Sequence, residues 1–302
     1  MAKAKFDMGV VYAEISANLI EMMENGVAPW SKPWIVRASN DPMMPRNGIS
    51  NRAYTGFNSL YLGMLMEENG WDDPRFYTMK SLGEGQQVKK GSKSTMIVFN
   101  KATQYDKENA EGEVETKTSW IARYYRVFNG SQIDGIEEFV KPEVEVDGFD
   151  HEDNGYPEAD FISNEWCDTL GGGLHTGHNK AYYTPIADSI HMPDADQFPV
   201  LAEYYQTLFH EIVHSTGHES RSDRLIRNAY GTSEYAKEEL VAEFGAAFVC
   251  ANTGVPLNTS QSAAYLKGWA ERCKEDPKLL FTAANAASYA ANMVYENTYA
   301  VA

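Results

Sequence analysis

Residues 199–218 read PVLAEYYQTLFHEIVHSTGH and give the clearest indication of the fold of the second half of this chain. Its large apolar residues recur at intervals of three and four, which is the period of an amphipathic helix. Pro199 is typical of a helix start and Gly217 of a helix end. Within the helix, His210 and His214 lie about 40° apart around the axis and roughly 6 Å along it. Two imidazoles at this spacing can converge on one cation.

The position of Glu211 indicates which chemistry the two histidines could support. It follows His210 directly, so its carboxylate can reach a metal-bound water without binding the metal. Zinc lowers the pKa of such a water to about 7, and a carboxylate can take its proton as the water attacks a carbonyl. His210-Glu211-x-x-His214 therefore predicts a site for zinc, or another divalent metal, with Glu211 as catalytic residue. The alternative is an ordinary buried helix with a surface glutamate, and the helical context favours the metal.

A third metal ligand is required, because two neutral histidines do not hold zinc. Residues 233–250, SEYAKEELVAEFGAAFVC, predict a helix that carries Glu238, Glu239 and Glu243. Glu239 and Glu243 lie one turn apart on one face. We expect Glu239 to be the ligand and Glu243 to hydrogen-bond the ring N–H of a ligand histidine, although the pattern leaves the choice among the three open. For each, a solvated helix face is the alternative.

Two further segments are expected beside this site. His218 follows Gly217, which ends the helix, so we expect it near the metal or facing the substrate rather than as a ligand. Residues 181–193, AYYTPIADSIHMP, predict a strand or hairpin interrupted near Pro185. The edge of such a strand could pair with an extended peptide.

Charge divides the chain into two parts. The formal net charge of −17 argues against nucleic-acid binding by the chain as a whole. However, residues 1–141 hold 17 basic and 18 acidic residues, whereas residues 142–302 hold 9 and 25. A shift of this size indicates a domain boundary. We predict an α+β protein with an N-terminal domain at 1–140, an acidic linker at 141–159 and a C-terminal domain at 160–302.

Composition narrows the class of protein. Hydrophobic residues make up 43% and charged residues 23% of the chain, as in folded globular proteins. No apolar stretch approaches the ~18 residues of a membrane-spanning helix, and the N-terminus lacks the apolar core of a signal peptide. The three cysteines never form a Cys-x-x-Cys pair. These features predict a cytoplasmic protein without membrane partners or a disulfide framework.

The first half contains a local basic window. Residues 75–105 hold six basic residues against one acidic residue, and aromatic residues are interleaved with them. Positive charge with exposed rings is the surface that binds single-stranded nucleic acid with little sequence preference. The candidate DNA contacts are Lys89, Lys90, Lys93, Trp30 and Trp34. The alternative is that the aromatic residues belong to the core and the lysines to a solvated turn.

Taken together, these segments resemble the ArdC-type antirestriction proteins of conjugative plasmids and related elements, whose N-terminal domain also occurs on TraC-type primases. The resemblance implies an N-terminal single-stranded-DNA-binding domain, a C-terminal zincin-like metallopeptidase domain, and protection of incoming DNA from host restriction. It also implies that His210 and His214 are ligands and Glu211 is catalytic. The segments that carry it are PWSKPW (29–34), AYTGFNSLYL (53–62), FYTMKSLGEGQQVKKG (76–91), YRVFNGSQIDGI (125–136), AYYTPIADSIHMP (181–193), HEIVHSTGHESR (210–221), YAKEELVAE (235–243) and the helical tail 265–296.

Three functions are compatible with these features. The first is an enzyme that binds single-stranded DNA and cleaves a protein, such as a host restriction protein or a protein bound to DNA. The second is a non-enzymatic single-strand binder whose zinc site is structural. The third is an acidic DNA mimic that occupies a restriction enzyme through the charge of the second half. The zinc-binding helix favours the first, because a mimic has no need of one.

Overall fold

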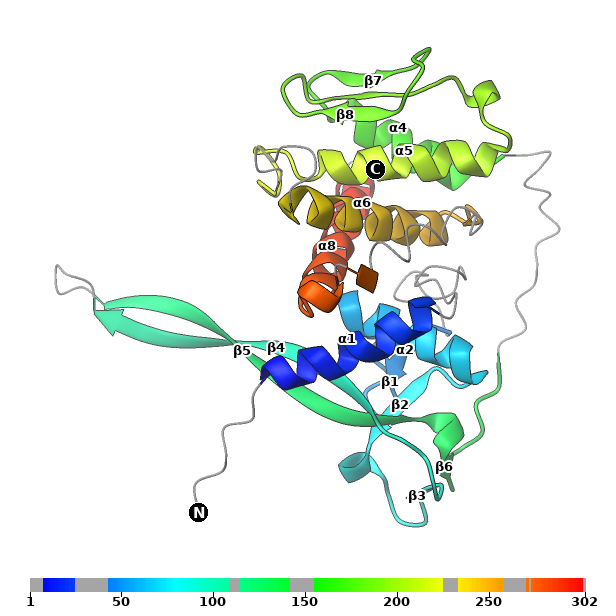
Figure 1. The fold of residues 1–302 in the computed structure, drawn as a ribbon, viewed down its shortest axis with the longest axis vertical. Helices are drawn as coiled ribbons and strands as arrows, with labels where there is room; N and C mark the ends of the chain where they lie inside the picture. The colour runs from blue at the N-terminus through cyan, green and yellow to red at the C-terminus, as the bar shows by residue number, and fades with distance from the viewer. Residues whose placement is uncertain are drawn as a thin grey trace.

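The computed structural model describes residues 8–24, 43–108, 114–141, 155–224, 233–257 and 270–300, apart from residue 272. Its helices and small sheets give the α+β fold and the two-part organisation expected from the sequence (Figure 1). Within these ranges, no helix combines the length and the apolar composition needed to cross a membrane.

The N-terminal half is built on a four-stranded sheet of order β1-β2-β5-β4. β4 pairs antiparallel with β5 along its whole length, and the two strands form a long hairpin that reaches out from the rest of the molecule (Figure 1). A short β3–β6 pair lies beside this sheet. The elements are β1 (Arg46–Asn47), β2 (Arg75–Thr78), the 3-10 helix η2 (Met79–Ser81), β3 (Gln87–Val88), β4 (Thr95–Glu108), β5 (Val114–Asn129), the 3-10 helix η3 (Gly130–Gln132) and β6 (Ile133–Asp134).

α1 (Met8–Glu24) packs on the face of the sheet that carries Met96 and Val98, whereas α2 (Gly56–Asn69) contributes side chains to the cores on both faces. The side chain of Asn58 fixes α2 to β4, because it donates to the carbonyl of Val98 at 2.7 Å and accepts from its N–H at 3.1 Å. α2 ends at Gly70, which adopts the left-handed conformation (φ 64°) that favours glycine. Most of α2 is buried, which requires packing partners on more than one side.

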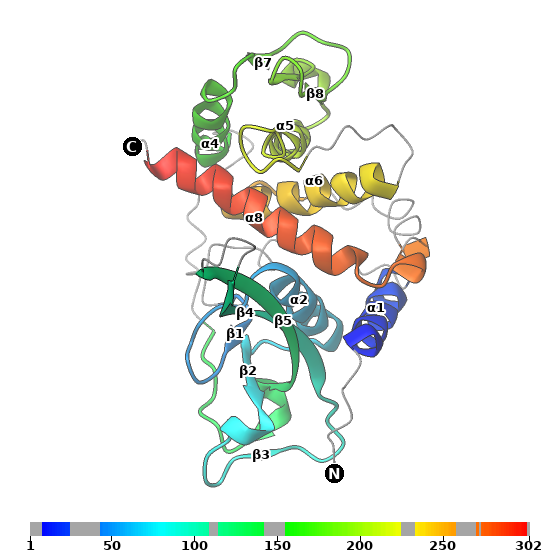
Figure 2. The same ribbon diagram turned by 90° about the vertical axis from the view of Figure 1, so that its left-hand side faces the viewer.

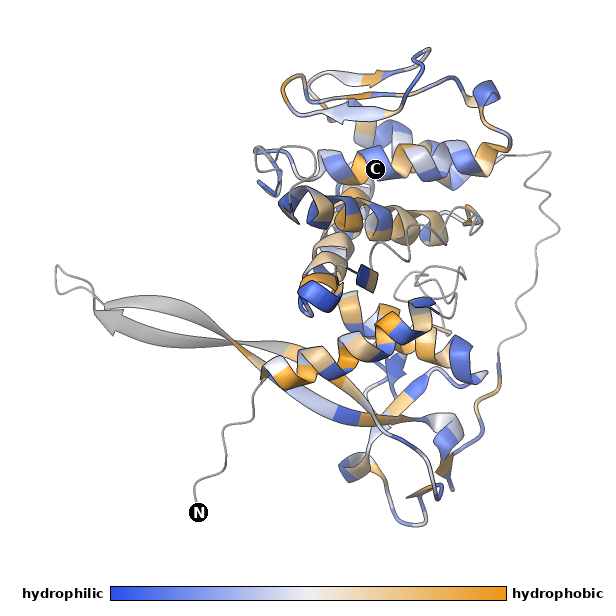
Figure 3. Cartoon of the chain, in the orientation of Figure 1, coloured by the Kyte–Doolittle hydropathy of each residue, from blue (hydrophilic) through white to orange (hydrophobic). Residues whose placement is uncertain are grey.

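The C-terminal half consists of helices around a three-stranded sheet of order β7-β9-β8. α5 forms where the apolar period predicted a helix, and apolar and polar residues alternate around it (Figure 3). It ends at Ser215, so His218 lies beyond the helix as Gly217 indicated. The elements are α4 (Pro157–Asp168), β7 (Gly173–His175), β8 (Tyr182–Thr184), β9 (Ser189–His191), the 3-10 helix η4 (Ala195–Gln197), α5 (Leu201–Ser215), α6 (Ser233–Asn252) and α8 (Leu279–Ala300).

The two halves share one hydrophobic core, and α8 joins them. It packs against α6 on one side and against α2 on the other (Figure 2). The rings of Phe57 and Phe281 stack with centroids 3.7 Å apart, and Asn285 accepts the backbone N–H of Phe57 at 3.1 Å. α4 begins at Pro157, inside the range 141–159 predicted as a linker, while residues 142–154 lie outside the described residues.

Candidate metal centre

α5 presents its histidines on the side away from the core. Its buried side anchors the helix through side chains that are no more than 1% exposed, namely Leu208, Phe209, Ile212 and Val213. On the other side, Nε2 of His210 and Nε2 of His214 lie 3.1 Å apart. The two rings are nearly perpendicular and aim these nitrogens at one point.

Glu239 of α6 completes a set of three donors. One of its oxygens lies 3.7 Å from Nε2 of His210 and the other lies 3.5 Å from Nε2 of His214. The ligands of a tetrahedral zinc at about 2.1 Å from the metal are about 3.4 Å from one another, so these separations fit a divalent cation. Among the described residues, His210, His214 and Glu239 are the only group of three or more metal-ligand side chains this close together. The expected ligand set therefore converges in space, and a tetrahedral metal held by these three side chains would have a fourth position for water or substrate.

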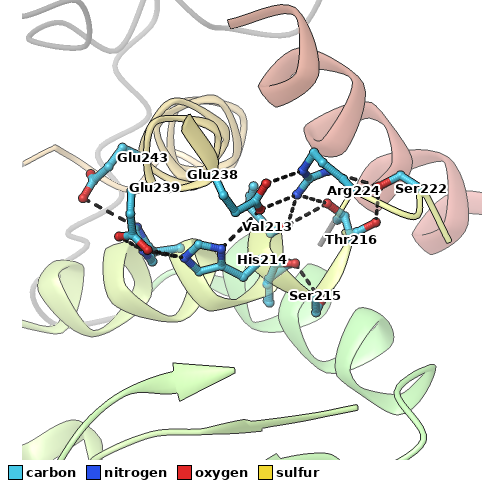
Figure 4. Close-up of polar contacts among 11 residues, drawn as sticks. Val213, His214, Ser215, Thr216, Ser222, Arg224, Glu238, Glu239 and Glu243 are labelled. Atoms are coloured by element: carbon cyan, nitrogen blue, oxygen red, sulfur yellow. Dashed lines mark hydrogen bonds and ion pairs between the residues drawn. The ribbon is translucent and has the colours of Figure 1, made fainter. Parts of the chain in front are cut away.

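The neighbouring glutamates of α6 flank this set differently (Figure 4). Glu238 is only 8% exposed and accepts a hydrogen bond from Nδ1 of His214 at 3.3 Å. Glu243 has an oxygen 3.6 Å from Nδ1 of His210. The structure thus assigns to Glu238 the ring hydrogen bond that the sequence assigned to Glu243, whereas Glu243 lies beside the second ligand ring without a hydrogen bond. A carboxylate on Nδ1 orients the ring and leaves Nε2 for the metal.

Arg224 holds Glu238 in place (Figure 4). Its guanidinium donates to both carboxylate oxygens, from Nε at 2.8 Å and from Nη2 at 2.9 Å, in a bidentate pair. Nη2 also donates to the carbonyl of Val213 at 2.8 Å. Because Val213 precedes His214 on α5, Arg224 ties the helix carrying the ligand to the carboxylate that orients it. Sequence reasoning missed Arg224. Its position shortly after the histidine motif, in HESRSDR, is a signal that could have indicated it.

The pKa values show how the site is charged before a metal binds. Burial and the nearby imidazole of His214 lower the pKa of His210 to about 3. Burial also opposes charge on His214, but hydrogen bonds to Glu238 and Glu239 outweigh it and raise its pKa to about 10. Burial and the charges of Glu239 and Glu211 raise the pKa of Glu243 to about 7. At neutral pH one histidine is therefore neutral and the other holds a proton that a metal must displace.

Glu211 lies between the metal ligands and the small sheet. It is 8% exposed, and burial raises its pKa above the ordinary value. The backbone N–H of Tyr183 donates to its carboxylate. Tyr183 is in β8, which is an edge strand of the sheet and the strand that contacts α5 most. The carboxylate is thus fixed beside the ligands by a backbone donor, as a general base requires.

A second ion pair holds β8 against α5. Asp188, in the turn between β8 and β9, accepts from the hydroxyl of Tyr183 at 2.7 Å and from the guanidinium of Arg221. Arg221 also donates to the carbonyl of Ser215 at the end of α5, at 2.8 Å. Asp188 has φ +46°, in the left-handed region. This clamp, Asp188 with Arg221 and Tyr183, fixes the strand that donates to Glu211.

The other expected site residues lie apart from this cluster. His218 is partly buried, and its Nδ1 hydrogen-bonds Ser220 at 2.8 Å. Lys89 donates to the carbonyl of Ser131 at 2.9 Å in the N-terminal half. Lys90 and Lys93 lie in the same segment, after β3. The two remaining DNA-contact candidates, Trp30 and Trp34, lie outside the described residues.

Two family models match this chain, one for each half. Residues 10–128 match the N-terminal domain of anti-restriction factor ArdC. Residues 163–286 match a zincin-like metallopeptidase, the class that the site geometry indicates. Among curated proteins, the DNA primase TraC of Escherichia coli is 33% identical over 288 residues, covering 90% of this chain and 26% of the primase. This chain spans about a quarter or less of the length of the curated TraC primases that it matches.

Relatives of similar length also exist. Protein y4eC of Sinorhizobium fredii is 30% identical over 293 residues, covering 94% of this chain and 91% of the relative. The metal-free crystal structure of the antirestriction protein ArdC from plasmid R388 is 34% identical, with a TM-score of 0.69 over 98% of this chain and 99% of that one. Its Mn(II)-bound structure gives a TM-score of 0.70 at 33% identity, over 97% and 98% of the two chains. With both domains matched in order and nearly the whole length aligned, this chain belongs to the ArdC family of antirestriction proteins.

Proposed function

We propose that this chain binds single-stranded DNA and is a zinc-dependent peptidase that protects incoming DNA from restriction in the host cytoplasm. The observation that carries the enzymatic part is the convergence of His210, His214 and Glu239 beside the buried Glu211. A purely structural zinc site is closed by four protein ligands, whereas three ligands with an open position are typical of catalytic zinc.

The residues have distinct roles in this proposal. A divalent metal held by the three ligands would supply a polarised water of near-neutral pKa. Glu211 is placed to act as the general base that would take a proton from the attacking water and pass it to the leaving amine of a peptide. The Tyr183 N–H orients the Glu211 carboxylate, and Glu238 keeps the His214 ring in the tautomer that leaves Nε2 free. β8 is an edge strand, and in this proposal its remaining backbone groups pair with an extended peptide.

The DNA-binding part rests on the N-terminal half. Its match to the ArdC N-terminal domain and the likeness of the chain to part of TraC primase support a role at DNA. The near-neutral charge of residues 1–141 allows contact with a polyanion, in contrast to the acidic second half. Single-stranded DNA is the form in which a protein of this type would meet incoming DNA during transfer.

Replacing Glu211 tests the enzymatic claim. We expect Glu211→Gln to bind zinc as tightly as the wild type, within about twofold, and to lose peptide hydrolysis by at least about 100-fold. Glu219→Gln changes an exposed glutamate just past the helix and serves as the matched control. Cleavage of unfolded casein and of host restriction subunits, with and without single-stranded DNA, provides the readout. Zinc content is measured on the same samples.

The same variant separates the enzyme from a non-enzymatic protector. Transfer of unmodified plasmid DNA into a restricting host measures protection directly. If Glu211→Gln protects as well as the wild type while holding zinc, the peptidase is dispensable for protection. A wild type that binds no stoichiometric divalent metal would refute the metal centre itself.

A further inference from the structure

An aromatic surface is exposed where the β4–β5 hairpin leaves the sheet. Phe99 is 40% exposed and Tyr125 is 44% exposed, and their rings lie edge to face with centroids 5.6 Å apart. Arg123 pairs with Phe99 in the strand register, and Tyr125 pairs with Ile97. Because paired residues project to the same side of a sheet, the exposed Phe99, Arg123 and Tyr125 share one face. We call these three residues the ribbon face.

Among the described residues, the ribbon face is the exposed continuation of a buried surface. Nearer the sheet, Ile97 and Val127 on the same side are 1% exposed and belong to a small core with Tyr54 and Phe76. The ring of Tyr54 reaches the edge of Phe99, with centroids 6.1 Å apart. Beyond this contact the rings stay open to solvent. Single exposed apolar side chains are ordinary on protein surfaces, whereas a contiguous exposed patch indicates an interaction site. Phe99 and Tyr125 are neighbours beside Arg123, so they form such a patch.

The opposite face of the hairpin is already occupied. Met96 and Val98 pack into the shared core there, and Arg126 lines a cavity of about 950 Å³. Glu14, Glu21 and Glu68 also line that cavity, and a Glu14 oxygen lies 3.9 Å from the Arg126 guanidinium. These carboxylates would repel a phosphate backbone. Neighbouring arginines of β5, Arg123 and Arg126, therefore face very different surroundings.

We propose that the ribbon face binds single-stranded DNA, with bases stacked on Phe99 and Tyr125 and a phosphate contacted by Arg123. The proposal rests on the DNA binding proposed above and adds the surface responsible. Aromatic rings supply sequence-tolerant stacking, and an adjacent guanidinium supplies the charge complementary to the strand. The lysine turn at residues 89–93 is less suited to the task. It carries no aromatic residue, and its Lys89 is tied to the Ser131 carbonyl and lies 4.0 Å from Asp134.

The test uses the full-length, metal-loaded protein and a fluorescein-labelled 20-mer of thymidylate in anisotropy titrations. We expect Phe99→Ala and Tyr125→Ala each to raise Kd by about 5- to 100-fold, whereas Tyr125→Phe, which keeps the ring, stays within about threefold of the wild type. Tyr289→Ala removes a 62% exposed ring from α8 and should leave Kd unchanged. Circular dichroism of each variant confirms that it is folded.

A salt titration tests the arginine separately. Each phosphate contact to a single strand contributes about 0.7 to the slope of log K against log salt, so Arg123→Ala should flatten that slope by about 0.7. Arg126→Ala, on the opposite face of the same strand, should leave the slope unchanged.

The outcomes distinguish a failure of the ribbon-face proposal from a failure of the proposed DNA binding. A wild type that does not bind the oligonucleotide would refute the proposed DNA binding as a whole. A wild type that binds, with the Phe99 and Tyr125 variants indistinguishable from Tyr289→Ala, would refute the ribbon face alone. If those variants instead change the sedimentation coefficient without changing Kd, the face joins two copies of this chain and the proposal is wrong.

Discussion

Removing the Arg224 guanidinium should weaken both the fold and the metal site. Arg224→Ala takes away two hydrogen bonds to Glu238, one to the Val213 carbonyl, and one to each of the hydroxyls of Thr216 and Ser222. The side chains of Arg224 and Glu238 are 17% and 10% exposed, so solvent can replace little of what is lost. Breaking a buried pair by deleting one partner costs about 3–5 kcal/mol, and the remaining exposure reduces our expectation to about 2–4 kcal/mol.

The loss of metal affinity follows from the freed Glu238 carboxylate. Without Arg224, this carboxylate no longer holds the Nδ1 proton of His214 in a fixed place, and the ring loses its orientation. Deletion of such an outer partner typically costs 10- to 100-fold in metal affinity, so we expect the zinc Kd of Arg224→Ala to rise by about that factor. Competition with a chromophoric chelator measures the affinity. Urea unfolding of the chelator-treated protein measures the stability.

A double variant distinguishes the two effects. Arg224→Met with Glu238→Leu removes both charges and fills the space with apolar atoms, which for buried pairs is often neutral or stabilising. Its free energy of unfolding should return to within about 1 kcal/mol of the wild type. Its zinc affinity should stay low, because Nδ1 of His214 still has no acceptor. Arg126→Ala, an exposed arginine, is the control for the loss of a guanidinium.

Two results would refute this reasoning. A zinc affinity of Arg224→Ala within twofold of the wild type would show that the Arg224–Glu238 pair does not orient His214. A double variant that recovers both stability and zinc affinity would show that the ring needs no acceptor, and that the loss in the single variant arises from unfolding near the site.

Three further outcomes follow from contacts elsewhere. Asp188→Asn should lower the free energy of unfolding by about 2 kcal/mol at pH 7, because Asn cannot replace the charge paired with Arg221. The pKa of Asp188 is held well below its usual range, so the wild type loses this contribution as pH falls below about 4. The difference in free energy of unfolding between wild type and variant should therefore close at low pH, as measured by urea titration. A metal must displace the proton of His214, whose pKa is raised to about 10. Apparent zinc affinity should therefore rise about tenfold per pH unit between pH 6 and 8. A zinc affinity that stays constant over this range in chelator competition would contradict this. Phe57→Ala deletes a ring stacked on Phe281 and should cost about 3–5 kcal/mol, with tryptophan fluorescence and circular dichroism still reporting one transition because both halves share a core.

The helical period made the metal-binding helix predictable from sequence. Apolar residues at intervals of three and four fixed which side of residues 201–215 is buried, and the same geometry placed His210 and His214 on the other side. Gly217 correctly indicated that His218 lies past the helix end. Such features depend on residues close in sequence, so the rules of a single helix are sufficient to predict them.

The roles of the three glutamates depended on packing between helices. Glu239 and Glu243 lie one turn apart, and Glu238 is a neighbour of Glu239, so each could face α5 on a suitable helix rotation. In the structure all three reach the histidines, and only their distances distinguish a donor to the metal from a partner of Nδ1. Arg224 and Asp188 were missed for a related reason. Their importance comes from partners 14 and 33 residues away, which no local pattern reveals.

Because the two halves share a core, the negative charge of the second half affects which surface DNA can approach. The acidic half is not held at a distance, because α8 packs directly on α2 of the N-terminal half. Repulsion therefore acts on any strand that approaches the side of the sheet carrying Met96 and Arg126, where Glu14 and Glu68 add to it. Phe99, Arg123 and Tyr125 lie on the other side of the β4–β5 hairpin. Since salt at physiological ionic strength screens charge repulsion over about 8 Å, the thickness of one sheet with its side chains is enough to separate the two environments. A chain of net charge −17 can thus offer a polyanion one face on which repulsion from its acidic half is weak.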